Sequence, residues 1–278
     1  MYQDLVGRFN SGRHTKLKWA RFKAIIDCLS SEEICQCIYD MLPNEYNRLL
    51  LDTFAQKLKD DITNNGWQPC HAILSQQLLE KFKAHESKQR RATILGGLAS
   101  LEATPQILRN EILQSLLSSN HENIRRCAYQ ALAETDTQDF IDEIEQAWLS
   151  YKDIPCARLI VKRLPKAFQE KHYDDLWALQ DERTTIHLLR NVDLTPDRLA
   201  TVKAADGITY AYICTKRGII FTSEEASSLW NQYAEHERAG LLIWCFGQMQ
   251  LKDVLTELQL HRTRHPTGPP KPLVLHGG

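Results

Sequence analysis

The chain has 278 residues, of which 43% are hydrophobic and 25% charged, and 34 basic against 35 acidic side chains leave a formal net charge of −1. A chain of this length can bury a core without disulfides or metals, and its balanced charge gives no general attraction to nucleic acid. The first residues lack the apolar stretch of a secretory signal, and no segment is apolar enough to span a membrane. We therefore expect a cytoplasmic protein without a membrane partner.

Residues 1–83 contain several segments with helical spacing of apolar residues and one clear break. The break is DITNNGWQP, where Gly66 and Pro69 favour a loop. We expect helices on both sides of it, at residues 16–29, 31–42, 44–62 and 70–83. The region is predicted to be a helical N-terminal cap on the rest of the chain.

A basic patch lies in the first of these helices and just before it. It consists of Arg13, Lys16, Lys18 and Lys23. Phe9, Trp19 and Phe22 are interleaved with these bases, a composition suited to nucleic acid or an acidic partner, because bases neutralise phosphates and aromatic rings stack on nucleobases. Alternatively, the aromatic residues belong to a helix buried between neighbours, and only the four basic side chains are available.

The cysteines and histidines do not predict a metal or cofactor. The eight cysteines are spread singly along apolar helical patterns, which is typical of buried free thiols. Cys35 and Cys37 have the wrong spacing for half of a zinc site, and Cys70-His71 stands alone in the sequence. His-Glu pairs recur in HESKQRRA, HENIRRCA and HERAG, and three copies spread along the chain cannot converge on one ion. Turn-capping is the favoured interpretation of these pairs.

The segment 121–133 predicts the clearest helix of the chain. Its apolar residues lie at positions i, i+3, i+4, i+7 and i+8, counted from Ile124. Ser119 or Asn120 is expected to cap it. The acidic run that follows, from Glu134 to Glu145, is typical of a solvated helix start, or of a docking patch for a basic partner.

Tryptophans recur where predicted helices run into acidic turns, in QAWLSYKD, DLWALQDE and SLWNQYAEHE. Trp148, Trp177 and Trp230 are 29 and 53 residues apart, the second interval being nearly twice the first. Such a period fits two helices and two turns, the unit of a solenoid. The sequence therefore predicts repeated helix pairs.

The segment HENIRRCAYQALAETD resembles the second half of a HEAT-type repeat, and the resemblance is clearest from Glu86 to Leu258. It implies an all-α, HEAT-like superhelix at residues 84–260. It also implies that Arg125 bridges to Asp153 or Glu134. Arg126 lies about 200° around the helix from Ile124, away from the buried face, and is the better candidate for a partner contact. HEAT-like DNA glycosylases line a groove with aromatic and basic side chains, and the three tryptophans could do so here. A recurring tryptophan is, however, more typical of core between repeats.

Two segments near the C-terminus depart from the helical pattern. GITYAYICTKRGIIF, at residues 207–221, is rich in β-branched and aromatic residues and could form a hairpin. Residues 261–278 contain four prolines and end in Gly-Gly, so we expect an extended tail.

No nucleophile elbow, P-loop or dinucleotide fingerprint is present, so the sequence favours no enzyme class. Solenoids expose long curved surfaces, which favours a protein-binding adaptor or scaffold, a subunit of a larger complex. Its expected partner contacts are Arg126, Trp148, Trp177 and Trp230. The alternative is a nucleic-acid-binding HEAT-like protein, more remotely a DNA glycosylase.

Overall fold

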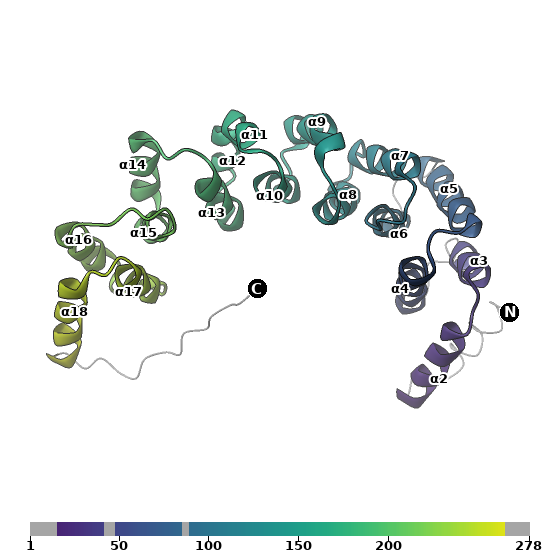
Figure 1. Cartoon of the computed structure of the whole chain (residues 1–278), viewed down its shortest axis with the longest axis horizontal. Coiled ribbons are helices and arrows are strands. Elements are labelled where there is room, and N and C mark those ends of the chain that lie inside the picture. Colours follow the sequence, from purple (N-terminus) through teal and green to yellow (C-terminus); the bar gives the residue numbers. More distant parts are fainter. Residues whose placement is uncertain (1–15, 42–47, 85–88, 265–278) are drawn as a thin grey trace. The chain divides into compact units, whose positions relative to one another are not determined.

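The computed structural model describes residues 16–41, 48–84 and 89–264, and in these ranges every regular element is a helix (Figure 1). The described residues form no β-strand, which confirms the all-α prediction. None of the described helices has the length and apolar character needed to cross a bilayer. The chain divides into two compact units, Met1–Leu164 and Pro165–Gly278, so the expected boundary at residue 83 falls inside unit 1.

Unit 1 consists of helix pairs joined by short turns. Its described helices are α2 (Lys16–Asp27), α3 (Ser31–Met41), α4 (Arg48–Asn65), α5 (Pro69–Ala84), α6 (Gln89–Ala99), α7 (Gln106–Leu117), α8 (Glu122–Glu134), the 3₁₀ turn η2 (Gln138–Phe140), α9 (Ile141–Tyr151) and α10 (Ile154–Arg163). Four of them match the predicted N-terminal helices. The predicted loop is short, because α4 continues to Asn65 and the chain turns at Gly66, whose φ is +79°.

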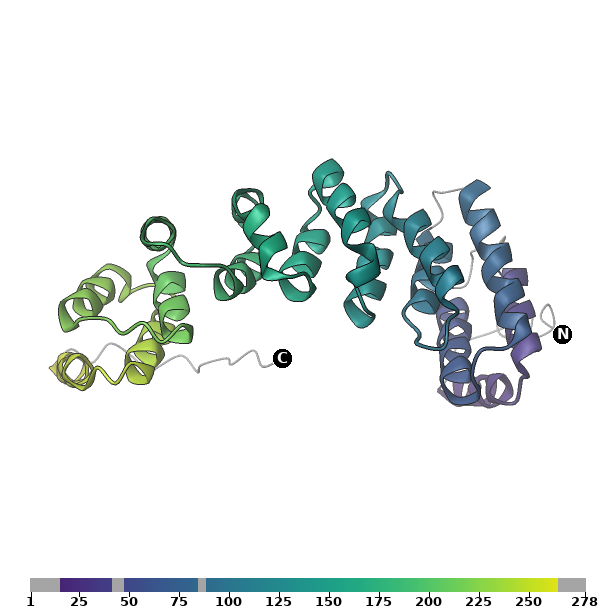
Figure 2. The same cartoon turned by 45° about the horizontal axis from the view of Figure 1, so that its top comes forward.

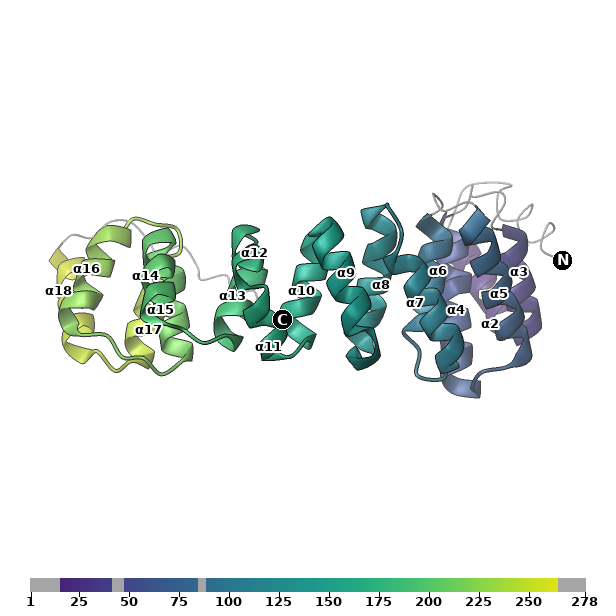
Figure 3. The ribbon, with the colours of Figure 1, turned by 90° about the horizontal axis from the view of Figure 1, so that it is seen from above.

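The helices of unit 1 pack in two rows. Helices α4, α6, α8 and α10 contact one another in that order, and in the second row α3 contacts α5 and α7 contacts α9. Figures 2 and 3 show the axes of neighbouring helices running alongside one another within the unit. Phe54, Phe140 and Trp148 are among the largest fully buried side chains of the core.

Arg125 of α8 connects two successive helix pairs of unit 1. Its Nε and Nη2 donate to the Asp153 carboxylate at 2.6 and 2.7 Å, and its Nη1 donates to the Ser119 carbonyl at 2.8 Å. The Tyr129 hydroxyl donates to the same carboxylate at 3.0 Å. The predicted bridge from Arg125 to Asp153 is therefore confirmed. The predicted cap is wrong in detail: α8 has His121 at its N-cap position, and Ser119 Oγ accepts instead from the His121 N–H.

Unit 2 has two rows as well. Its helices are α11 (Lys166–Lys171), α12 (Tyr173–Ala178), α13 (Glu182–Asn191), α14 (Pro196–Ala205), α15 (Gly207–Lys216), α16 (Ser223–Tyr233), α17 (Ala239–Gln248) and α18 (Lys252–Arg264). Helices α13, α15 and α17 lie side by side in one row, and α12, α14 and α16 each contact a member of that row (Figure 1). The row of α13, α15 and α17 thus has one side covered by a second layer.

The suspected hairpin at residues 207–221 is instead a helix followed by a turn. Asp206 accepts hydrogen bonds from the backbone N–H groups of Ile208 and Thr209, which starts α15. Gly218, with φ of +71°, ends it, and Ile219 N–H donates to the Cys214 carbonyl. Burial explains the outcome: nearly every side of α15 is covered, so its apolar residues pack without an alternating pattern.

The C-terminal boundary also differs from the prediction. Residues 261–264 belong to α18 and are not part of an extended tail. The first proline of the tail is Pro266, which disfavours helix at the preceding residue but not before it. The rest of the predicted tail, residues 265–278, lies outside the described residues.

Candidate protein-docking face

The three recurring tryptophans lie in different environments. Trp148 of α9 is fully buried, so it belongs to the core of unit 1 and cannot contact a partner of the folded unit. Trp177 and Trp230, of α12 and α16, are half-buried. The Trp177 ring stacks on Tyr173 with 6.4 Å between centroids. Of the three, only Trp177 and Trp230 remain candidates for a partner contact.

Arg126 and Lys23 are exposed, as expected of partner contacts. Phe22, next to Lys23, is buried with 6% of its surface exposed, so it cannot stack on a nucleobase. Arg13 and the side chains of Lys16 and Lys18 lie outside the described residues. The side chain of Trp19 and the whole of Phe9 also lie outside the described residues, so the structure describes only the side chains of Lys23 and Phe22 in this patch.

An aromatic surface on α15 and α17 was missed by the sequence analysis. Trp244 and Ile243 each leave 39% of their surface exposed, and the Trp244 ring lies 6.1 Å from the ring of Tyr212. The Lys216 ammonium lies 5.1 Å from the Trp244 ring centroid and 5.6 Å from that of Tyr212. Each contact is within cation–π range, so the cation and the two rings form one cluster on the surface.

The neighbouring helix α13 adds positive charge. Arg183, Ile186 and Arg190 follow one another at helical spacing on its less buried side, and both arginines are exposed. Helices α15 and α17 contain no acidic residue, and the only one in α13, Glu182, lies 3.5 Å from Arg238. We call the set of exposed and partly exposed residues on α13, α15 and α17 the docking face; it consists of Arg183, Ile186, Arg190, Tyr212, Lys216, Ile243 and Trp244.

Sequence pattern alone could not find this face, because α17 reads AGLLIWCFGQ and has no charged side. Leu242, Cys245 and Phe246 are fully buried, whereas Ile243 and Trp244 between them are not. The difference arises because α17 packs mainly on α15, α16 and α18 within the described unit, and these contacts leave Ile243 and Trp244 partly uncovered. Only the position of the neighbours separates core from surface here.

The structure also brings together residues that the sequence keeps apart. Cys35 of α3 lies beside Cys70 and His71 of α5. Cys70 and His71 have no further candidate ligand nearby in the sequence, but the fold brings one to them. Burial raises the pKa of the Cys35 and Cys70 thiols above the ordinary value, so both are neutral thiols. Burial also lowers the pKa of His71, more than the carboxylate of Asp61 raises it.

Comparisons with known proteins add no relative. No family model matches the chain, and neither a curated protein nor a solved structure matches it.

Proposed function

We propose that the chain is a non-catalytic adaptor built of HEAT-like helix pairs, and that its docking face holds an acidic segment of a partner protein within a larger complex. The observation that carries the proposal is the exposed Trp244–Tyr212–Lys216 cluster. Tryptophan and tyrosine are enriched among the residues that dominate binding energy at protein interfaces. When a partner covers large exposed rings, the removal of their apolar surface from water contributes favourably to the free energy of binding.

Charge selects the occupant. Lys216 lies beside the aromatic rings, the neighbouring helix α13 exposes Arg183 and Arg190, and neither α15 nor α17 contains a carboxylate. Complementary charge speeds association and excludes partners of the same sign. An acidic segment with one apolar or aromatic anchor fits both parts of the face: the anchor covers Trp244, and the carboxylates pair with the bases.

The helix-pair packing inside each unit supports the HEAT-like part of the proposal, since successive pairs contact each other through α4, α6, α8 and α10 in unit 1 and through α13, α15 and α17 in unit 2. We further propose a cytoplasmic location, where the eight free cysteines remain reduced. Arg126 is a candidate second contact on unit 1. Nucleic-acid binding, the alternative class, enters as an outcome of the test below.

The test is selection of a displayed random peptide library on the full chain, followed by affinity measurement on variants. We expect the selected peptides to combine Asp or Glu with an apolar residue. Trp244→Ala and Lys216→Glu should each weaken their binding at least tenfold. Lys252→Glu, which reverses an exposed charge on α18, a helix outside the docking face, is the matched control and should bind normally.

Two outcomes would overturn the proposal. One is a set of selected peptides without acidic bias, or with unchanged affinity for Trp244→Ala. The other is nanomolar binding of a DNA or RNA oligonucleotide at about 0.15 M salt that the same two variants abolish, which would make the face a nucleic-acid site.

A further inference from the structure

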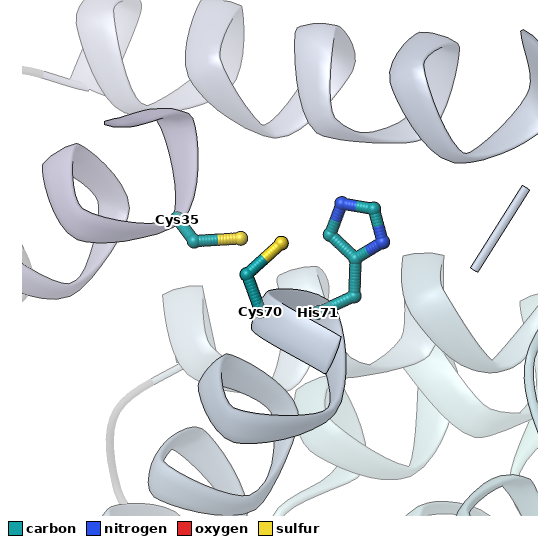
Figure 4. Close-up of side chains that lie close together, drawn as sticks. All are labelled: Cys35, Cys70 and His71. Atoms are coloured by element: carbon teal, nitrogen blue, oxygen red, sulfur yellow. The ribbon is translucent and has the colours of Figure 1, made fainter. Parts of the chain in front are cut away.

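Two thiols and an imidazole meet inside unit 1, between α3 and the first turn of α5. The Sγ atoms of Cys35 and Cys70 and a ring nitrogen of His71 all lie within 4.8 Å of one another. Figure 4 shows the two thiols pointing toward each other with the His71 ring beside them. Cys35 and His71 are buried and Cys70 is partly exposed, so the cluster has one side open to an entering ion.

The nitrogen of His71 that can face an ion is Nε2. The other nitrogen, Nδ1, accepts a hydrogen bond of 3.0 Å from the Gln68 backbone N–H. Nε2 is fully buried and has no partner at hydrogen-bond geometry among the described residues, although Asp61 Oδ2 lies 3.2 Å away. Nε2 is therefore held by a poorly aligned contact to a carboxylate, and a buried polar atom with such a contact leaves part of its hydrogen-bonding energy unrealised.

We propose that Cys35, Cys70 and His71 form a zinc site, with the fourth position taken by a solvent oxygen. Two sulfurs with nitrogen and oxygen are a ligand set that zinc accepts in tetrahedral geometry. Bonds of about 2.3 Å to sulfur and about 2.0 Å to nitrogen or oxygen place tetrahedral ligands about 3.3 to 3.8 Å apart. The ligand atoms of Cys35, Cys70 and His71 lie within 4.8 Å of one another, so each pair needs to close by about 1 to 1.5 Å at most.

Binding changes the protonation of the cluster. Both thiols lose their protons to solvent as the ion binds, and two thiolates balance the charge of Zn²⁺. With the ion on Nε2, the proton of the neutral imidazole moves to Nδ1, which can no longer accept from Gln68. The cost is small relative to two zinc–thiolate bonds, because Gln68 precedes α5 and its N–H lies outside the helical ladder.

The competing outcome for two facing thiols is a disulfide. Hydrogen peroxide would oxidise the two thiols to the disulfide and would itself be reduced to water. The thiol–thiol contact alone does not distinguish the two. His71 does, because an imidazole nitrogen that faces the sulfurs has no part in a disulfide. The experiment therefore includes both ions and oxidant.

The experiment uses the full chain, reduced and freed of metal with a chelator. Cobalt(II), a spectroscopic substitute for zinc, should bind one equivalent with thiolate-to-cobalt charge-transfer absorption, and zinc should displace it. Cys35→Ser and Cys70→Ser should each remove this absorption. Cys37→Ser is the matched control, since Cys37 is a buried thiol of the same helix outside the cluster, and its absorption should be unchanged.

A measurement on the unmutated chain guards against variants that fail to fold. Zinc should raise its melting temperature and protect Cys35 and Cys70, but not the exposed Cys28, from alkylation detected by mass spectrometry. Absence of the cobalt absorption, or absorption retained in both cluster variants, overturns the site. Rapid formation of a Cys35–Cys70 disulfide with peroxide, without protection by zinc, also overturns it.

Discussion

Arg125 and Asp153 form a two-pronged ion pair that ties α8 to the start of α10, with only 4% and 7% of the two side chains exposed. The Arg125 guanidinium also lies 3.6 Å from the centroid of the Tyr151 ring of α9. One residue therefore contacts the next helix pair through charge and through an aromatic face. Arg126, the next residue, is exposed on the same helix.

The first prediction compares these two arginines. Arg125→Ala should destabilise unit 1 by about 3–5 kcal/mol, because Asp153 is left buried without its cation. Arg126→Ala should change the free energy of unfolding by no more than about 0.5 kcal/mol, as usual for an exposed position. Urea denaturation followed by circular dichroism measures both. Equal losses would show that Arg126 has a structural role.

The second prediction concerns two adjacent glycines of α6. A Cβ at Gly96 would lie 2.9 Å from the Cys127 carbonyl oxygen of α8, whereas at Gly97 it would meet the end of the Lys59 side chain. Gly96→Ala should cost about 1–3 kcal/mol, since backbone must move. Gly97→Ala should be neutral or stabilising by up to about 1 kcal/mol, since Lys59 can swing aside and alanine favours helix. A loss for Gly97→Ala as large as that for Gly96→Ala would contradict this reading of the α6–α8 contact.

The third prediction separates a core tryptophan from a surface one. Trp148→Ala should lower stability by about 3–5 kcal/mol, because it empties a fully buried site. Trp244→Ala should cost no more than about 1 kcal/mol while weakening binding of the selected acidic peptides. Thermal melts and peptide titrations on the same samples test both. Peptide affinity that falls for Trp148→Ala at a temperature where it is folded would place the binding site elsewhere.

The fourth prediction uses Asp206, at the start of α15. Burial alone raises its pKa, but hydrogen bonds from Thr209 and the charge of Arg238 outweigh burial and hold the pKa below 3.8. A carboxylate with a lowered folded-state pKa stabilises the fold above its unfolded pKa, and this contribution is lost as pH falls through the folded value. The wild type should therefore lose stability over that range.

Asp206→Asn is the matched variant, because its amide oxygen can still cap α15 but carries no charge. The stability difference between wild type and Asp206→Asn should be constant near neutral pH and shrink as pH falls below about 3.8. Denaturation across a pH series measures it. A difference that does not change at acid pH would show that the Asp206 charge contributes nothing.

The sequence by itself determined that most of the chain is helical, although it left residues 207–221 open to a hairpin. Apolar residues at helical spacing predicted α8, and the same pattern predicted the helices around Gly66, because this local signal depends only on the helical period. The link from Arg125 to Asp153 also followed from the chain, through its resemblance to a repeat whose neighbouring pairs are joined by such a contact.

Only the tertiary structure decided which side of a helix is exposed where the apolar pattern does not single out one face. The uniformly apolar α17 could not reveal that Trp244 faces out, and Trp148 could not be distinguished from Trp177 until neighbours covered it. The group of Cys35, Cys70 and His71 likewise arises from the packing of α3 against α5, which brings together two cysteines that are 35 residues apart in the chain. Contacts between distant segments depend on how helices stack, and no local spacing encodes that.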